Sequence, residues 1–181
     1  MSEKKSGPNI GKLVIVLTLV CAITSAVLGG VNAITKDRIA QIKEEKTNAA
    51  LAEVLPIAEN DAYTEMTDFQ GDEAVTHVWQ AEAGYVVQMD ISGAQGMIDM
   101  VVGVDKEGAV TGVSIIGHGE TPGLGAKATE VEFRDQYVGI TGSAALTKSG
   151  GTVEALTGAT ITSQAVTDGV NIALATVATL G

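Results

Sequence analysis

A glycine-rich segment at residues 117–127, GHGETPGLGAK, holds the densest group of residues suited to binding chemistry. Its four glycines and one proline are incompatible with regular structure and predict a loop with close backbone approach and exposed N–H groups. A loop of this kind directly after a strand often wraps a ligand. A tight connection that needs glycine would have the same composition, so the segment predicts either a ligand-binding loop or a structural turn.

A second segment, residues 154–163 with the sequence EALTGATITS, collects small and hydroxyl residues directly ahead of an apolar helical pattern. The first-turn N–H groups and the macrodipole of a helix favour a phosphate group, so this segment predicts a phosphate site. Alternatively, Thr160 or Thr162 only caps the helix. The residues alone leave both interpretations open.

Three polar side chains of the glycine-rich segment have two interpretations each. His118 could donate a hydrogen bond to a ligand or hold the loop itself. Glu120 is expected to brace the loop or accept a hydrogen bond from a nearby N–H group rather than act as an acid–base catalyst. Lys127 could neutralise a phosphate or lie in solvent.

Three further residues of the body could also contact a ligand. His77 is expected to be an ordinary half-buried side chain of a strand. Trp79 and Tyr85 could stack on a flat ligand, although packing in a core or interface is the favoured interpretation.

The composition excludes several classes of function. Lys and Arg number 11 against 22 Asp and Glu, which gives a formal charge of −11 in 181 residues and argues against nucleic acid as a ligand. One cysteine, Cys21, and two histidines exclude a disulfide framework, thiolate metal clusters and CxxC redox chemistry. We therefore predict no metal site and no catalytic acid–base set.

The N-terminal part of the chain is built as a membrane anchor. Between Lys12 and Lys36 lie 23 uncharged residues, which as a helix would extend roughly 34 Å and cross a bilayer. A cleaved signal peptide is the alternative, because Val31-Asn32-Ala33 resembles a small-x-small cleavage site, but the apolar run is longer than a usual signal sequence. Cys21 is interpreted as a membrane-buried residue rather than a lipidated one.

The charge distribution separates this anchor from the rest of the chain. Seven basic residues stand against four acids up to Lys46, whereas four basic residues stand against eighteen acids from Thr47 onward. We expect a cytoplasmic tail at residues 1–12, a transmembrane helix at 13–35, a membrane-proximal helix at 36–56 that Pro56 ends, and an extracytoplasmic domain at 57–181. The flanking charges decide the orientation only weakly, and the short polar tail favours a cytoplasmic N-terminus.

The body is expected to be an α+β domain with a mainly antiparallel sheet and packed helices. Runs rich in β-branched residues predict strands at 74–80, 84–91, 97–104 and 109–116, with a hairpin turn at 105–108. A helical start is expected at 127–133, and short strands at 143–147 and 152–155. The final segment, 162–180, places an apolar residue at every third or fourth position and predicts a helix against the sheet.

The two glycine- and hydroxyl-rich segments together, HGETPGLGAK and LTGATITSQAV, resemble the FMN-binding domain of the RnfG family, to which NqrC is related. The pattern F-x-x-Q-(F/Y)-x-G of that family is matched by Phe133, Gln136, Tyr137 and Gly139. The resemblance implies that Thr160, the last residue of the T-G-A-T motif, is joined to FMN through a phosphodiester. Glu154 stands where the family most often has Asp.

The resemblance also implies which residues surround the flavin and what the protein does. The expected FMN-binding residues are His118, Glu120, Thr121, Pro122, Gly123, Leu124, Gly125, Lys127, Thr157, Gly158, Ala159, Thr160 and Thr162. The implied function is that of an electron-carrier subunit of a membrane-bound, ion-translocating ferredoxin:NAD⁺ oxidoreductase (Rnf complex). An NqrC-like role in Na⁺-translocating NADH:quinone reductase and a membrane-anchored binding module without redox function are the alternatives.

The partners and the location follow from the same resemblance. The partners would be the other Rnf subunits, the FAD:protein FMN transferase that attaches the flavin, and membrane lipid. The chain would lie in the cell (inner) membrane as a single-pass protein. The many acids of the body would disfavour added negative charge when the flavin is reduced.

Overall fold

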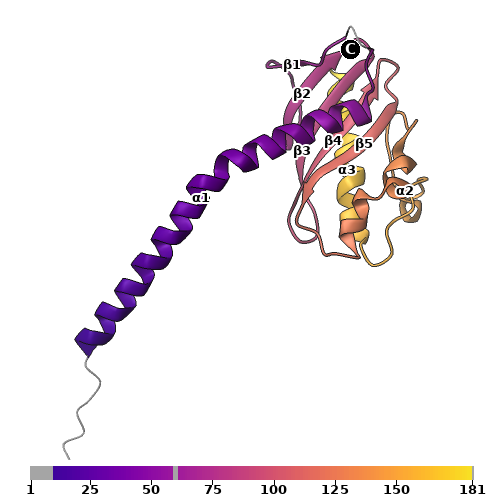
Figure 1. Cartoon of the computed structure of the whole chain (residues 1–181). Coiled ribbons are helices and arrows are strands. Elements are labelled where there is room, and N and C mark those ends of the chain that lie inside the picture. Colours follow the sequence, from indigo (N-terminus) through magenta and orange to yellow (C-terminus); the bar gives the residue numbers. More distant parts are fainter. Residues whose placement is uncertain (1–9, 59–60, 181) are drawn as a thin grey trace, which may run out of the picture. The chain divides into compact units, whose positions relative to one another are not determined.

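The computed structural model describes residues 10–58 and 61–180, and the chain divides after Glu44 into two units. Helix α1 (Ile10–Val54) begins in the first unit and ends in the second (Figure 1). Its apolar side chains from Ile10 to Ile34 are exposed. Within residues 10–58 and 61–180, α1 is the one helix long and apolar enough to cross a membrane. The predicted tail, residues 1–12, lies mostly outside the described residues.

The second unit is organised around a five-stranded antiparallel sheet whose strands follow chain order. The strands are β1 (Thr64–Met66), β2 (Val75–Ala81), β3 (Gly84–Ser92), β4 (Met97–Asp105) and β5 (Val110–His118). The four predicted strands match β2 to β5 within two residues at each end. The predicted turn between β4 and β5 is also present, closed by a 3.1 Å hydrogen bond from the N–H of Gly108 to the carbonyl of Asp105.

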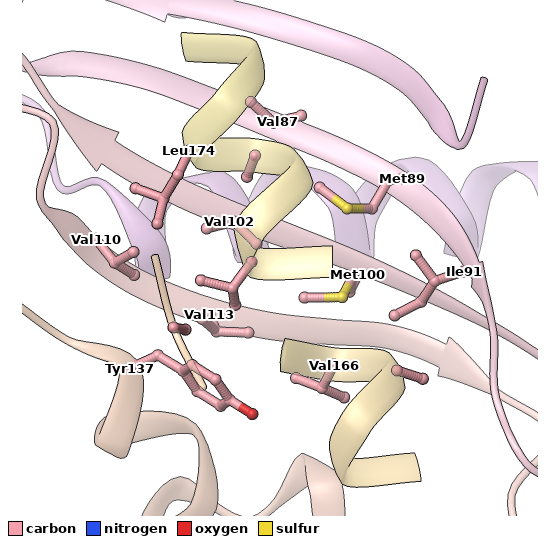
Figure 2. Packing of buried hydrophobic residues seen from close by; sticks show 14 of the residues in the cluster. Val87, Met89, Ile91, Met100, Val102, Val110, Val113, Tyr137, Val166 and Leu174 are labelled. Carbon is pink, nitrogen blue, oxygen red and sulfur yellow. The ribbon is translucent and has the colours of Figure 1, made fainter. Parts of the chain in front are cut away.

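Helix α3 (Thr160–Ala178) covers one face of this sheet. The alternation along β3 and β4 directs Met89 and Met100 toward the buried side of α3, where they pack with Val166 (Figure 2). Gly169 allows a close approach, because a Cβ there would lie 2.6 Å from the sulfur of Met100. The apolar stripe that predicted this helix is therefore its core face, and the helix starts two residues earlier than expected.

The last turn of α1 covers the opposite face. Leu51 and Val54 pack there with Val86 and Val101. The paired strand residues Gly103 and Gly112 leave room for this turn, because a Cβ at Gly112 would lie 2.9 Å from the Cα of Val54. The helix ends at Val54, ahead of Pro56 as predicted.

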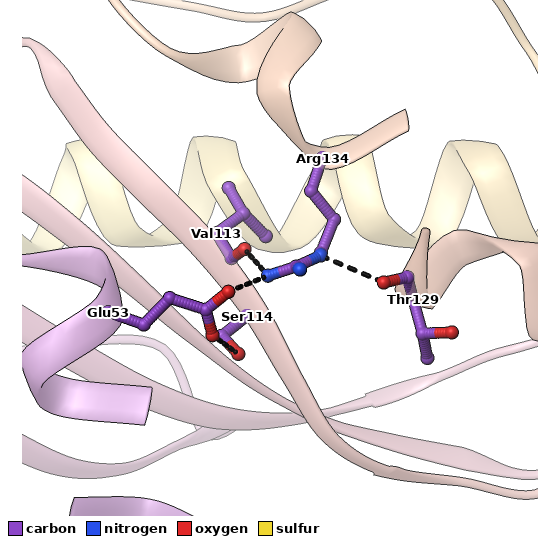
Figure 3. Close-up of polar contacts among 5 residues, drawn as sticks. All are labelled: Glu53, Val113, Ser114, Thr129 and Arg134. Carbon is purple, nitrogen blue, oxygen red and sulfur yellow. Dashed lines mark hydrogen bonds and ion pairs between the residues drawn. The ribbon is translucent and has the colours of Figure 1, made fainter. Parts of the chain in front are cut away.

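A polar network attaches this last turn of α1 to β5 and to the short helix α2 (Val131–Arg134) (Figure 3). Arg134 donates 2.8 Å hydrogen bonds to Glu53 and to the carbonyl of Val113 and a 3.0 Å bond to the carbonyl of Thr129. Ser114 donates to the other carboxylate oxygen of Glu53 at 2.7 Å. Burial opposes ionisation of Glu53, but the Ser114 and Arg134 hydrogen bonds outweigh it and lower the pKa of this carboxyl.

The connection from β5 to α3 contains short helical turns rather than further strands. These are η1 (Gly125–Thr129), α2, η2 (Asp135–Tyr137) and η3 (Thr147–Ser149). The predicted strands at 143–147 and 152–155 are wrong, because only one parallel bridge, Leu146 to Val153, joins these segments. The turn η3 and its C-cap residue Gly150, with a φ of 85°, occupy the segment between the two bridged residues. The domain is α+β, as expected.

Candidate functional site

The T-G-A-T segment leads directly into the first turn of α3. Gly158 has a φ of 77°, which favours glycine, and a Cβ there would lie 3.2 Å from Leu124 of the glycine-rich loop. Ala159 is the N-cap residue, and no side chain of the described residues caps this end of α3. The alternative that Thr160 or Thr162 serves as a helix cap is therefore wrong, and the first-turn N–H groups are left without a side-chain acceptor.

The hydroxyl groups at this end of α3 differ sharply in accessibility. Thr162 and Ser163 are fully buried, and both hydroxyls are engaged in hydrogen bonds inside the domain. Thr160 and Thr157 are exposed. Of the hydroxyl-bearing residues within α3, Thr160 is the exposed one.

The buried partner of Thr162 is Glu120, 42 residues earlier in the chain. Glu120 is only 6% exposed, and its carboxylate accepts the hydroxyl of Thr162 at 2.6 Å and the N–H of Gln95 at 3.1 Å. One side chain thus joins the glycine-rich loop, the β3–β4 turn and the start of α3. Glu120 therefore braces the loop.

The hydrogen bonds to Glu120 also set its charge. Burial opposes ionisation, but donation from Thr162 and from the N–H groups of Gln95 and Ala94, with the nearby His118, outweighs it and lowers the pKa of the Glu120 carboxyl. The carboxylate is therefore ionised at neutral pH.

Glycines pack against this carboxylate from two sides. A Cβ at Gly93 or at Gly125 would overlap a Glu120 oxygen, and one at Gly125 would also lie 2.7 Å from the hydroxyl oxygen of Thr162. His118 is exposed and accepts the N–H of Glu120 at its Nδ1 atom, 3.2 Å away. His118 thus contacts the backbone of the loop, and its hydrogen bond to a ligand stays a prediction.

The other members of the glycine-rich loop form its exposed surface. Thr121, Pro122, Gly123 and Leu124 are exposed, and the carbonyl of Thr121 accepts the N–H of Leu124 at 3.2 Å. Gly123 has a φ of 77° in this turn. Residues 121–124 of the loop are therefore exposed to solvent, whereas Glu120 and Gly125 are buried.

Two hydrogen bonds between the side chain of Gln136 and the backbone of Glu154 hold the segment ahead of the T-G-A-T motif. Gln136 accepts the N–H of Glu154 at 2.6 Å and donates to its carbonyl at 3.4 Å. Gln136 stands in the chain between Phe133 and Tyr137, which are both buried and whose rings meet edge to face with centroids 5.7 Å apart. The sequence pattern contained Gln136, but the bond to Glu154, 18 residues away, has no signal in the sequence.

Two surface grooves flank the T-G-A-T segment. The first, which we name the Thr160 groove, has a volume of about 310 Å³ and is lined by Ser92, Lys148, Thr160, Ile161, Gln164, Ala165 and Asp168. The second, the Glu154 groove, has a volume of about 500 Å³ and is lined by residues that include Lys127, Glu130, Glu132, Glu154 and Thr157. The predicted site residues Lys127 and Thr160 therefore lie in different grooves, and Lys148 was missed.

The aromatic candidates lie elsewhere. The side chain of His77 is 49% exposed, its Nδ1 atom forms a 2.7 Å hydrogen bond with Glu65, and its ring stacks on Trp79 with the ring centroids 5.4 Å apart. Trp79 packs with the residues that contact the last turn of α1, and Tyr85 packs against the core beneath α3. His77 is therefore about half-buried on its strand, as expected, beside the three-residue edge strand β1.

Taken together, the accessible residues suit a phosphate-bearing ligand rather than acid–base chemistry. The exposed Thr160 hydroxyl lies in a helical turn whose N–H groups lack a side-chain acceptor, and this is a favourable position for an anion. A groove opens beside this hydroxyl. FMN, which carries a phosphate at one end and a flat ring at the other, fits this arrangement.

Comparison with known proteins gives matches along nearly the whole chain. A family model described as an FMN-binding domain matches residues 93–175, and one described as the RnfG N-terminal region matches residues 1–54. The G subunit of an ion-translocating oxidoreductase complex from Methanosarcina acetivorans is 34% identical over 96% of each chain. The G subunit of a Na⁺-translocating ferredoxin:NAD⁺ oxidoreductase complex from Acetobacterium woodii is 32% identical, covering 90% of this chain and 89% of the relative.

A third relative and one solved structure extend the comparison. The G subunit of a proton-translocating ferredoxin:NAD⁺ oxidoreductase complex from Clostridium ljungdahlii is 32% identical, covering 99% of this chain and 97% of the relative. The C subunit of a Na⁺-translocating NADH-quinone reductase from Parabacteroides distasonis is 17% identical, with a TM-score of 0.45 over 73% of this chain and 79% of that one.

Proposed function

The chain belongs to the RnfG family, the G subunits of ion-translocating oxidoreductase complexes, and from this premise we propose that it is an electron-carrier subunit of a membrane-bound ferredoxin:NAD⁺ oxidoreductase. It carries an FMN-binding domain, and FMN supplies the redox chemistry when bound. The polypeptide contributes attachment, position and electrostatics. Among the relatives compared, those at 32–34% identity are all G subunits, which favours this complex over the quinone reductase.

The attachment point that we propose is the hydroxyl of Thr160, through a phosphodiester to FMN. The observation that carries this proposal is the accessibility of that hydroxyl, since Thr162 and Ser163 in the same helical start are buried and already bonded. The first-turn N–H groups of α3 would bind the remaining charge of the phosphate. Covalent attachment would keep the flavin on an open surface without requiring tight non-covalent binding.

An intact-mass measurement tests the attachment. The full chain is produced together with an FAD:protein FMN transferase, beside Thr160→Ala and Thr157→Ala variants. We expect an FMN-sized mass increment in the original chain and in Thr157→Ala, and none in Thr160→Ala. An unmodified original chain in the presence of a transferase that modifies a positive control would contradict the proposal.

The same experiment separates the redox carrier from a binding module without redox function. The module predicts a colourless chain without added mass, whereas the carrier predicts a yellow one that is reduced and reoxidised reversibly. The proposed partners are the other subunits of the complex, including a second flavin-carrying membrane subunit, and the transferase. Ion passage is assigned to those other subunits, because the apolar part of α1 between Lys12 and Lys36 holds no charged residue.

The apolar segment of α1 anchors the chain to a membrane. We propose that residues 13–35 cross the cell membrane with the N-terminus in the cytoplasm, and that the FMN domain lies outside it in contact with lipid and partner subunits. Labelling of cysteines introduced at an exposed site of the domain, such as Thr157, with an impermeant reagent on intact cells tests this orientation. Labelling only after lysis would contradict the proposed orientation and place the domain in the cytoplasm.

A further inference from the structure

We propose that the polar network around Arg134 connects the last turn of α1 to both flanks of the glycine-rich loop, so that displacing this turn loosens the loop. The same helix carries the apolar segment that anchors the chain. The network is therefore a connection through which the anchoring helix acts on the order of the loop. The inference goes beyond the proposed function, because it rests on contacts within the domain and does not require an attached flavin.

The upstream flank of the loop is part of the network. Strand β5 leads directly into the glycine-rich loop, and two neighbouring residues of this strand bond to the network. The carbonyl of Val113 accepts a 2.8 Å hydrogen bond from Arg134, and the hydroxyl of Ser114 donates to Glu53 at 2.7 Å. The start of the loop is thus held by a strand that is bonded to both α1 and α2.

The downstream flank reaches the network through consecutive backbone hydrogen bonds. The N–H of Arg134 donates to the carbonyl of Glu130 at 3.2 Å, and the N–H of Glu130 donates to the carbonyl of Lys127 at 2.9 Å. The N–H of Lys127 then donates to the carbonyl of Leu124, inside the loop, at 3.1 Å. A shift of Arg134 is therefore passed to the loop along this series, to which the exposed bond from Arg134 to the carbonyl of Thr129 adds.

The Arg134 side chain fixes geometry as well as contributing stability. It is only 12% exposed, and its Nη1 atom donates to both Glu53 and the carbonyl of Val113 (Figure 3). A guanidinium is planar and holds its donors in fixed directions. An apolar side chain could fill the same space, but it would not set the positions of the last turn of α1, of β5 and of α2 relative to one another.

The last turn of α1 has further contacts that lie outside the network. Leu51 and Val54 are buried in a cluster separate from the core beneath α3. The carbonyl of Val54 accepts the hydroxyl of Thr111 at 2.5 Å. Shortening the side chain of Leu51 would therefore loosen this turn without removing any hydrogen bond of Arg134 or Glu53.

A second attachment of the loop makes its order measurable when the network is lost. Glu120 joins the loop to α3 through Thr162, so loss of the network would loosen the loop without releasing it. The N–H groups of Leu124 and Ala126 both donate to the carbonyl of Thr121 at 3.2 Å. These amides are protected from hydrogen exchange only while this turn is formed, so their exchange rate reports the order of the loop.

Hydrogen exchange of the full chain in detergent micelles, produced without the transferase, tests the connection. Arg134→Met removes the central donor of the network, and we expect the amides of residues 121–127 to exchange about tenfold faster, as for the loss of about one hydrogen bond. Val87→Ala is the matched control, because it shortens a buried side chain of the core beneath α3. Both variants should exchange faster in the strands, whereas Val87→Ala should leave the loop within about twofold of the original.

A second substitution tests transmission from α1. Leu51→Ala is made both in the original chain and in the Arg134→Met variant. In the original chain we expect it to raise the exchange rate of the loop at least about threefold, because the loosened turn displaces Arg134. In the Arg134→Met variant it should change that rate by less than about twofold, because the connection is already broken.

The outcomes separate this inference from the proposed function. The inference would be overturned by unchanged loop exchange in Arg134→Met or Leu51→Ala, by an equal effect of Leu51→Ala with and without Arg134, or by an equal acceleration of the loop in Val87→Ala. A chain that shows the expected exchange but never takes up FMN would overturn only the attachment to Thr160. A flavin-loaded chain without the expected exchange would overturn this inference alone.

Discussion

The hydrogen bond between Thr162 and Glu120 allows a sharp test of how the site is held together. Replacing Thr162 with valine keeps the branched shape and removes the hydroxyl that donates to the carboxylate at 2.6 Å. Both residues are buried, so water cannot replace the lost donor. Glu120 keeps only its backbone donors, of which the N–H of Gln95 lies at 3.1 Å.

The expected loss follows from the charge of the acceptor. A hydrogen bond to an ionised group contributes roughly 1.5–3 kcal/mol, so Thr162→Val is expected to lower the free energy of unfolding by about 2 kcal/mol. For a domain of this size the melting temperature would fall by about 6–10 °C. Thr157→Val is the matched control, since its hydroxyl is exposed, and we expect a change within about 0.5 kcal/mol.

Thermal unfolding of the full chain in detergent micelles, followed by near-ultraviolet circular dichroism, measures this loss. The pH dependence gives a second readout. The pKa of Glu120 is lowered in the folded protein, so its contribution is present above the unfolded pKa of about 4.3 and is lost as pH falls through the folded pKa. Removing the Thr162 donor raises the folded pKa, so the acid-induced loss begins at a higher pH in the variant.

Two results would refute this reasoning. A melting temperature of Thr162→Val equal to that of the original chain at pH 7 would mean that the brace contributes nothing to stability. An undiminished difference between the two chains at a pH below both pKa values would show that the loss comes from packing rather than from the charged hydrogen bond.

Two further substitutions test the attachment of the end of α1. Arg134→Met removes the donor to two backbone carbonyls and to Glu53. We expect the free energy of unfolding, measured by urea titration, to fall by about 2 kcal/mol, mostly from the part-buried bond to the carbonyl of Val113, because the bond to the carbonyl of Thr129 is exposed and Glu53 is half exposed. An effect no larger than that of Glu53→Gln would contradict this. Gly112→Ala places a Cβ 2.9 Å from the Cα of Val54, and we expect it to lower the free energy of unfolding by about 1–3 kcal/mol. Gly117→Ala on the same strand is the control, because its Cβ meets a first neighbour only at 3.9 Å and should cause no such loss. Equal losses of stability in the two variants would contradict the close approach of α1 to this strand.

The main elements could be predicted because their signals are local. The strands are runs rich in β-branched residues, and β3 and β4 are buried along most of their length, while the apolar stripe from Val166 to Val177 has the helical period. The stretch at 143–155 failed because its residues have the propensity of strands. Propensity does not reveal that η3 and Gly150 lie between Leu146 and Val153, which form a single bridge.

The candidate site also has features that were recognisable from local sequence and others that were not. The T-G-A-T and glycine-rich segments were recognisable from composition and spacing, and so was Thr160 as the residue that the resemblance singles out. The division between exposed Thr160 and buried Thr162 was not recognisable, because it depends on which face of α3 packs onto the sheet. The expected group of binding residues therefore mixed surface residues with the buried brace.

The sequence by itself determined the anchor, the acidic character of the body, the two motifs and the family, because each of these is written in consecutive residues. Only the tertiary structure decided that Glu120 joins Thr162 across 42 residues, that Gln136 brackets Glu154, and that Lys148 rather than Lys127 shares a groove with Thr160. These contacts depend on how the long connection after β5 folds back against α3. Side-chain contacts between distant segments leave no pattern of periodicity or composition in the sequence, so they can be identified only in the folded structure.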